Sequence, residues 1–168
     1  MPQEDADHRA QIVALLPRLR RFCAALTRSG DAGDDLCQAT IERALSRGDQ
    51  FEPGTRLDSW MYRIARNLQI DGARRQKTRG TEIDIDNAFD VAGDDGRTIV
   101  EGRSDLHRAR AAMARLPEEQ RALMALVVLD GQSYKDAAEI LAIPIGTVMS
   151  RLARARRAIE LDVRGAGA

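Results

Sequence analysis

The chain has 168 residues, of which 43% are hydrophobic and only 4% aromatic, so its core must be built mostly from aliphatic side chains and alanine, which suits helices. Its 26 basic and 26 acidic residues give a formal net charge of zero, and no apolar run is long enough for a membrane span or a secretory signal. Two histidines and two cysteines show no zinc-site spacing, and no Gly-rich phosphate loop or nucleophile–base pair is present, so we expect a cytoplasmic protein that is not an enzyme and uses no cofactor.

The first predicted helix covers residues 9–28, where apolar residues recur on a broad stripe and Ser29-Gly30 marks the end. Pro17 lies within this pattern and predicts either a kink or a later helix start. Cys23 on this helix, and Cys37 on the next, are expected to be reduced, buried thiols, with a disulfide or redox switch as the alternative.

The second and third helices are predicted over residues 34–47 and from Asp58 or Ser59 to about residue 75. Two acids open the second helix, which is favourable at a helix N-terminus, and Leu45 is among its inward-facing residues. Asp58 or Ser59 can cap the third helix. Trp60 falls on the apolar side of that helix, which favours core packing over base stacking.

An acidic segment over residues 81–103 follows, with Asp, Gly and little periodicity, and it is typical of a flexible linker. Residues 56–80 hold seven basic and two acidic residues, residues 81–96 hold six acidic and no basic ones, and residues 147–164 hold five basic and two acidic ones. The zero net charge therefore conceals two basic surfaces suited to nucleic acid.

The C-terminal part predicts helices over residues 106–116 and 118–129, then a helix-turn-helix unit. In that unit, residues 134–141 form the first helix, Pro144 breaks it, and Thr147 can cap the second. One face of the second helix is apolar, and the opposite face carries the polar side chains Thr147, Ser150, Arg151 and Arg154. Such a helix enters the DNA major groove, where Arg and Ser contact bases or phosphates; a solvated Arg-rich face is the alternative.

No strand alternation persists, so the predicted fold is all-α, with two small helical domains joined by the acidic linker. The predicted boundaries are residues 9–80 for the first domain, 81–103 for the linker and 104–164 for the second domain.

Four motifs resemble, in order and spacing, the bacterial RNA polymerase sigma factors of the extracytoplasmic-function (ECF) group, which keep only sigma regions two and four. Residues 35–45 resemble the polymerase-binding helix, and residues 60–67, followed by Asp71 and Arg74-Arg75, resemble the promoter-melting helix. Residues 116–121 and 144–152 resemble region four. Region two also resembles the general-stress branch of alphaproteobacteria.

The resemblance implies a sigma factor that binds core RNA polymerase and both double-stranded and melted promoter DNA, acts in a stress or envelope response, and is held inactive by an anti-sigma protein. The residues that match the polymerase-binding positions are Asp35, Gln38 and Arg43. Those expected at the minus-ten region are Arg56, Arg63, Arg66, Asn67, Arg74 and Arg75. Those expected at the minus-thirty-five region are Thr147, Met149, Ser150, Arg151 and Arg154.

Two departures limit what the resemblance implies about promoter sequence. Met149 stands where relatives often have Arg, and a thioether cannot donate a hydrogen bond to guanine. Leu57 replaces the aromatic residue often found before the third helix, next to the segment 49–57 that in the family captures an unstacked base. The acidic linker remains either a solvated tether or a mimic of nucleic acid inside the polymerase channel.

Two other functions remain open. A helix-turn-helix regulator that is not a sigma subunit would explain the C-terminal half but not the motifs at 35–45 and 60–67. A sigma-like decoy that sequesters an anti-sigma protein would explain all the motifs without promoter binding.

Overall fold

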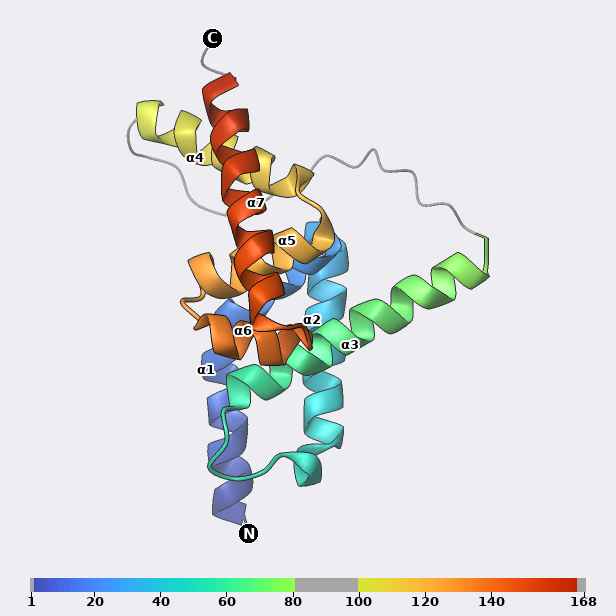
Figure 1. Cartoon of the computed structure of the whole chain (residues 1–168). Coiled ribbons are helices and arrows are strands. Elements are labelled where there is room, and N and C mark those ends of the chain that lie inside the picture. Colours follow the sequence, from blue (N-terminus) through green and yellow to red (C-terminus); the bar gives the residue numbers. More distant parts are fainter. Residues whose placement is uncertain (1, 81–99, 166–168) are drawn as a thin grey trace.

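The computed structural model describes residues 2–80 and 100–165, and every regular element within these ranges is helical (Figure 1). This confirms the predicted all-α class. The elements are α1 (Pro2–Thr27), α2 (Gly30–Ser46), η1 (Gly48–Gln50), α3 (Leu57–Thr78), α4 (Val100–Arg115), α5 (Glu118–Leu123), η2 (Met124–Leu129), α6 (Tyr134–Leu141) and α7 (Ile145–Gly165). Most of the predicted acidic linker, residues 81–99, lies outside the described residues, and α4 begins within the remainder of that segment.

The predicted starts of the second and third helices are wrong. The hydroxyl of Ser29 accepts a hydrogen bond from the N–H of Ala32 at 3.3 Å, so α2 begins at Gly30 and not at residue 34. Helix α3 begins at Leu57, and Asp58 lies in its first turn, where its carboxylate accepts side-chain donors from other elements. The carboxylate of Asp58, which the sequence predicted as a possible cap of α3, therefore binds side chains from other parts of the fold.

Two proline predictions have different outcomes. Pro17 is exposed inside α1, which already runs from Pro2, so the later helix start is wrong. Pro144 does separate α6 from α7, but its own carbonyl accepts the N–H of Thr147 at 3.0 Å. Thr147 is therefore inside the first turn of α7 and does not cap it, because the helix begins directly after the proline.

Helices α1, α2 and α3 form the N-terminal half, in which α2 crosses α1 at short range. A Cβ on Gly33 would lie 2.9 Å from the Cα of Ala24, so only glycine fits this crossing without a shift. Cys23 and Cys37 are buried free thiols in this half, as predicted. Leu45 is 49% exposed, so its predicted inward position is wrong.

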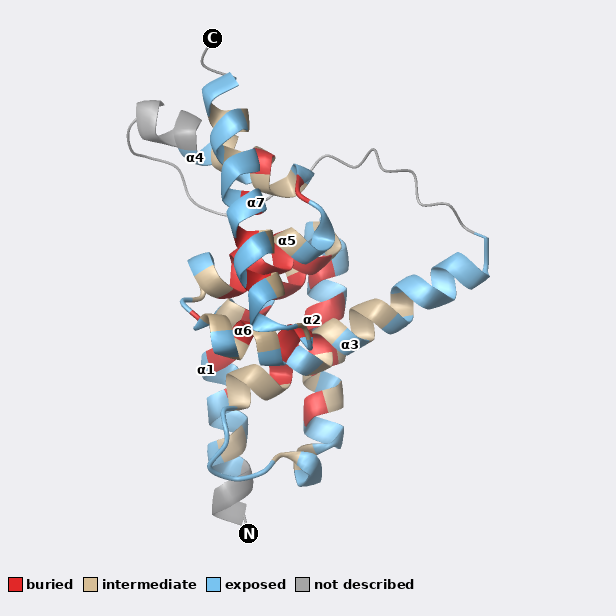
Figure 2. Cartoon of the chain, viewed as in Figure 1, coloured by how far each residue is buried: buried red, intermediate tan, exposed pale blue. Residues whose placement is uncertain are grey.

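Helices α4 to α7 form the C-terminal half, whose centre is the continuous segment of α5 and η2. Residues 121–126 are all buried, and the predicted single helix over 118–129 changes at Met124 into a π-helical turn. Pro117 precedes α5 and Asp130 follows η2, as the sequence predicts. Figure 2 shows the buried residues concentrated where α5, α6 and α7 meet the N-terminal helices.

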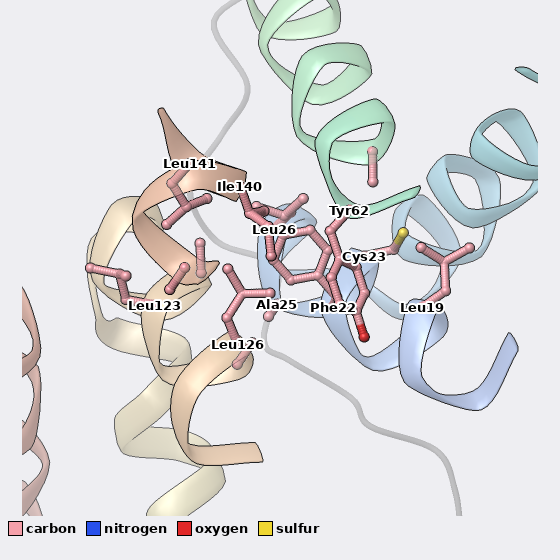
Figure 3. Close-up of a cluster of buried hydrophobic side chains, with 14 of the residues drawn as sticks. Leu19, Phe22, Cys23, Ala25, Leu26, Tyr62, Leu123, Leu126, Ile140 and Leu141 are labelled. Atoms are coloured by element: carbon pink, nitrogen blue, oxygen red, sulfur yellow. The ribbon is translucent and has the colours of Figure 1, made fainter. Parts of the chain in front are cut away.

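The two halves share one hydrophobic core. In Figure 3, Phe22 and Leu26 of α1 point toward Leu123, Leu126 and Ile140 of the C-terminal half. Helix α1 packs against α5 and η2, and α3 packs against α6. The two halves are therefore packed directly against each other, an arrangement that the sequence did not predict.

Candidate nucleic-acid interface

Helices α6 and α7 form the predicted helix-turn-helix unit. The hydroxyl of Ser133 caps α6 by accepting a hydrogen bond from the N–H of Asp136 at 3.0 Å. After Leu141, Ala142 takes a left-handed conformation with φ 51°, a common way to end a helix, and Pro144 prevents its continuation. The turn between α6 and α7 is therefore explained by two neighbouring residues: Ala142, whose left-handed conformation ends α6, and Pro144, which prevents its continuation.

The two faces of α7 divide as the sequence predicts. Val148, Leu152 and Ala155 are buried against the rest of the C-terminal half, and Ile159 is partly buried beside them. Met149, Ser150 and Arg154 are exposed, and the Ser150 hydroxyl donates to the carbonyl of Thr147 at 3.2 Å. The open face thus offers a thioether, a hydroxyl and a guanidinium group; Thr147 is half-buried.

Arg151, also predicted to contact DNA, is engaged within the protein. Its Nη2 lies 2.9 Å from Oε2 of Glu119, and its side chain is only 25% exposed. Arg151 is therefore less available than Arg154, because a DNA phosphate or base would have to replace the carboxylate of Glu119, which lies in the same half of the chain.

Helix α3 carries the second basic face. Arg63, Asn67, Arg74 and Arg75 are exposed, and the first three recur at helical spacing. The C-terminal part of α3 projects beyond the body of the molecule and is exposed there (Figures 1 and 2). These side chains form a row of hydrogen-bond donors that suits a phosphate backbone.

Arg66 lies on another face of α3, half-buried in a cleft between the halves of about 150 Å³. Arg151, Glu118 and Glu119 line the same cleft. The structure thus brings together Arg66 and Arg151, which the sequence assigned to different promoter elements. Burial raises the pKa of Glu118 above its ordinary value, although Arg121 and Arg28 oppose the shift.

A hollow of about 280 Å³ lies between the C-terminal end of α2, η1 and α3. It brings Arg43, predicted to contact polymerase, together with Arg63 and Asn67, predicted to contact DNA. Arg47, which was not predicted from the sequence, also lines it, as does Gln50 of the segment 49–57 expected to capture an unstacked base. The spacing of Arg47, one turn after Arg43, is the signal that would have identified it.

The other two predicted polymerase-contacting residues lie earlier on α2. Asp35 and Gln38 are exposed, and the Gln38 amide donates to Oε1 of Glu42 at 3.1 Å. They form a polar, solvent-facing surface one helical turn apart, and such a composition is typical of the rim of a protein interface.

Arg56, predicted at the minus-ten region, binds two carboxylates on different halves. Its Nη2 lies 2.8 Å from Oδ2 of Asp58, and its Nη1 lies 2.5 Å from Oδ2 of Asp136 on α6. Nη2 also donates to Oε1 of Gln132 at 2.8 Å. This arginine therefore links α3 to the helix-turn-helix unit.

The carboxylates at this junction are held in their charged form. Burial alone would raise the pKa of Asp58, but hydrogen bonds from Arg56, Gln132 and Arg18 outweigh it and place the pKa well below its usual range. Asp130 behaves alike: burial opposes the shift, and hydrogen bonds from Arg18 and Gln132 lower its pKa. The junction is thus a charged, hydrogen-bonded cluster of low proton affinity.

Among the residues that the structure describes, no group of His, Cys, Asp and Glu side chains is arranged to hold a metal ion. Within the same ranges, no helix is both long and apolar enough to cross a membrane.

Comparison with known families matches both halves of the chain. Residues 106–159 match the family described as Sigma-70, region 4, and residues 12–66 match the family described as the Sigma2 domain of PhyR. The ECF RNA polymerase sigma factor EcfG of Rhodopseudomonas palustris (strain TIE-1) is 37% identical over 156 residues, covering 93% of this chain and 84% of the relative. The ECF RNA polymerase sigma factor SigW of Bacillus subtilis (strain 168) is 28% identical, covering 95% of this chain and 91% of the relative.

Two solved structures are similar in fold. The sigma factor RpoE of Bartonella quintana, in complex with the anti-sigma factor NepR, has a TM-score of 0.76 and 30% identity, covering 94% of this chain and 97% of that chain. The anti-anti-sigma factor PhyR of the same organism, complexed with NepR, has a TM-score of 0.56 and 19% identity over 89% of this chain and 48% of that chain. The second likeness concerns the fold alone.

Proposed function

Because the chain belongs to the ECF family of bacterial RNA polymerase sigma factors, we propose that it binds core RNA polymerase through α2 and reads promoters through α3 and α7. The observation that carries this proposal is the presence of two separate cationic helix faces on one chain, one on α3 and one on α7. A protein that contacts a promoter at two elements needs two such faces, and polymerase supplies the catalysis.

For the polymerase contact, we assign Asp35 and Gln38 as the exposed polar pair on α2. Arg43 lies in the hollow beside Asn67, so we place it at the border between the polymerase surface and the DNA surface. Loss of Asp35 or Gln38 should then reduce holoenzyme formation, whereas loss of Arg43 should also reduce promoter opening.

For the minus-ten region, Arg63, Asn67, Arg74 and Arg75 form the exposed row on α3 and are assigned to phosphates or base edges. Arg66 and Arg56 are assigned to the same region, but Arg66 lines the cleft between the halves and Arg56 binds Asp136 of the other half. Their contribution therefore requires that the halves separate.

For the minus-thirty-five region, Arg154, Ser150 and Met149 form the open part of α7, with Thr147 and Arg151 at its edge. The exposed thioether of Met149 can contact a thymine methyl group but cannot donate to guanine. We therefore expect the promoter position that faces Met149 to favour thymine, whose methyl group makes an apolar contact, over guanine.

The regulatory partner is proposed from RpoE, which was solved in complex with the anti-sigma factor NepR. We propose that this chain binds an anti-sigma protein of the same kind, and that it acts in the cytoplasm in a stress response. Binding of the partner would cover surfaces that polymerase and promoter DNA also use.

The decisive experiment is run-off transcription with purified core polymerase and a genomic promoter library. We expect promoter-specific transcripts with the wild type and fewer with Asn67→Ala or Arg154→Ala. Arg157→Ala, which removes an exposed arginine of α7 outside the assigned set, is the matched control. Duplex binding by the protein alone, with no promoter-specific transcripts, would instead indicate a regulator that is not a sigma subunit.

A second function is favoured by one specific observation: residues 12–66 match the Sigma2 domain of PhyR, which is an anti-anti-sigma factor in the solved complex. The chain could on this ground sequester an anti-sigma protein. The same transcription assay separates the two functions, because a decoy binds an anti-sigma protein but yields no transcript with core polymerase.

A further inference from the structure

The segment 49–57, which runs from η1 into the start of α3, is shaped by local hydrogen bonds. Both the N–H and the hydroxyl of Thr55 donate to the carbonyl of Glu52, at 3.2 and 2.7 Å. Most of the segment is exposed to solvent. At its C-terminal end, Arg56 binds the carboxylate of Asp136 on α6. The attachment at its N-terminal end is aromatic.

Phe51 attaches that N-terminal end to two helices. Its ring lies between the rings of His8 on α1 and Trp60 on α3. The centroids of Phe51 and His8 are 5.3 Å apart at an angle of 35°, and those of Phe51 and Trp60 are 5.2 Å apart at 50°. Both distances fall in the range of favourable aromatic pairs. Figure 1 shows the loop after η1 passing beside the N-terminal part of α1. We call these three side chains the aromatic row.

Trp60 is a fixed end of the aromatic row and connects it to the DNA-facing side of α3. The indole packs against the hydrophobic core, which holds it in place. It also lines the hollow of about 280 Å³ that contains Arg63 and Asn67, both assigned to the minus-ten region. Gln50 lines the same hollow. Because Gln50 directly precedes Phe51 in the chain, the position of Phe51 determines how Gln50 meets the hollow.

His8 is the other fixed end of the aromatic row. It lies one turn before Ile12 and two turns before Leu15 on the same face of α1, and both of these residues are buried. His8 itself is half-buried, and its Nε2 is buried with no hydrogen-bond partner among the residues that the structure describes. The contact between His8 and Phe51 is therefore a packing of rings and does not depend on a hydrogen bond at Nε2.

A segment that is already ordered captures a base at a lower cost. A flexible segment loses conformational freedom when it closes on an unstacked base, and this loss of entropy opposes capture. A segment held by the aromatic row has lost that freedom before DNA arrives. The first contact with duplex phosphates gains nothing from this order, because Arg74 and Arg75 lie in the C-terminal part of α3, away from the segment.

We infer that His8 is a positioning residue for promoter opening: through Phe51 it holds the segment 49–57 against Trp60, in the conformation that captures an unstacked base. This inference rests on the proposed sigma function, in which the segment meets the melted strand. It gives a role to the start of α1, which lies outside residues 12–66 that match the Sigma2 domain of PhyR.

The first test follows Trp60, which is the single tryptophan of the chain, so that its fluorescence reports on the aromatic row in the free protein. We expect acrylamide to quench this fluorescence more strongly in His8→Ala and in Phe51→Ala than in the wild type. His8→Phe keeps a ring and should return the quenching to the wild-type value. The matched control is Val13→Ala, because Val13 is 62% exposed on the same helix. Unchanged quenching in His8→Ala would overturn the inference.

The second test measures promoter opening with the full chain, core polymerase and a promoter from the run-off library. An adenine of the minus-ten element is replaced by 2-aminopurine, whose fluorescence rises when the base unstacks. We expect His8→Ala to reduce the equilibrium constant for unstacking by roughly two- to tenfold, the worth of one aromatic pair. Affinity for the duplex promoter, measured by mobility shift at low temperature, should equal that of the wild type.

The control variants separate positioning from a general loss of structure. His8→Phe should restore unstacking, and Val13→Ala should leave both unstacking and duplex affinity unchanged. A purely structural role of His8 would lower unstacking and duplex affinity together, and that result would overturn the inference. Circular dichroism checks that each variant keeps its helices. Phe51→Ala keeps the test valid if His8→Ala unfolds, because it disrupts the aromatic row without changing α1.

Combining the two substitutions shows whether His8 acts through Phe51. His8→Ala with Phe51→Ala should lose no more unstacking than Phe51→Ala alone, whereas losses that add would overturn the inference. If the wild type yields no promoter-specific transcripts, the sigma function is rejected and the positioning role with it. Normal transcription together with wild-type unstacking in a helical His8→Ala protein would reject the positioning role alone.

Discussion

At Gly33, the absence of a Cβ atom allows α1 and α2 to approach each other closely. Gly33→Ala would place a Cβ 2.9 Å from the Cα of Ala24 and 3.2 Å from Oγ1 of Thr27. Because backbone atoms cannot rotate away, we expect the free energy of unfolding to fall by about 1–3 kcal/mol, as in overpacked cores. Chemical denaturation followed by circular dichroism measures this change.

The control at the same scale is Gly72→Ala. Gly72 lies inside α3, and a Cβ added there would have no neighbouring atom within 4 Å, so alanine should raise stability by roughly 0.5–1 kcal/mol through helix propensity. If Gly33→Ala and Gly72→Ala changed the free energy of unfolding equally, close packing at the α1–α2 crossing would not be what requires glycine at position 33.

Arg121 is the second residue with a large expected effect. It is 1% exposed, and its guanidinium donates to the carbonyls of Ala25, Leu26 and Leu116. Burial, aided by repulsion from Arg28, lowers its pKa to about 10, so it is still charged at neutral pH. Arg121→Ala leaves a cavity and three carbonyls without this donor, and we expect a loss of about 2–4 kcal/mol.

Thermal unfolding measures that loss, with Arg110→Ala as the control because Arg110 is exposed on α4. Arg121→Lys should be intermediate, since one ammonium group cannot reproduce the planar fork that reaches three carbonyls. A melting temperature of Arg121→Ala equal to that of the control would contradict the structural role.

At the scale of the element, α7 yields a prediction about DNA binding. In the holoenzyme, Arg154→Ala and Arg151→Ala should each weaken promoter binding by roughly 1–3 kcal/mol without changing the fold. Footprinting measures the effect, and Arg157→Ala serves as the control. If both alanine variants gave wild-type footprints, Arg151 and Arg154 would not belong to the DNA interface.

The helices themselves were largely predictable from local pattern. Residues 134–141 are the bounds of α6 as predicted, and the apolar faces of α7 and α1 are the buried ones. The starts of α2 and α3 were wrong by about one turn or less, and the cap at Thr147 was wrong, because several nearby polar residues can serve as caps and tertiary partners choose among them.

At the scale of the whole molecule, acid should loosen the contact between the halves. Hydrogen bonds from Arg and Gln partners lower the pKa of Asp58 and Asp130 against the opposing effect of burial, and the Ser133 hydroxyl and Arg56 lower that of Asp136. Carboxylates with lowered pKa values contribute stability that is fully present above about pH 4 and is lost as the pH falls through the lowered values.

We therefore expect stability to be insensitive to these groups from about pH 5 to 8 and to fall below about pH 4. Denaturation curves across this range measure the slope. The variant that combines Asp130→Asn, Gln132→Ala and Asp136→Asn should show a shallower fall than the wild type. An identical slope in the two proteins would show that Asp130 and Asp136 do not contribute to the acid sensitivity.

The all-α class, the helix-turn-helix unit and the resemblance to ECF sigma factors could be predicted from the amino-acid sequence, because these depend on periodicity and on motifs whose residues are neighbours in the chain. The sequence also placed Thr147, Ser150, Arg151 and Arg154 on an open face of α7, of which Ser150 and Arg154 are exposed. The packing of the helices in three dimensions was needed to establish that the two halves share a core, and that Arg56 and Arg151 are bound to carboxylates. Arg18 and Asp130 are 112 positions apart, and no local pattern specifies a contact between two charges at that separation.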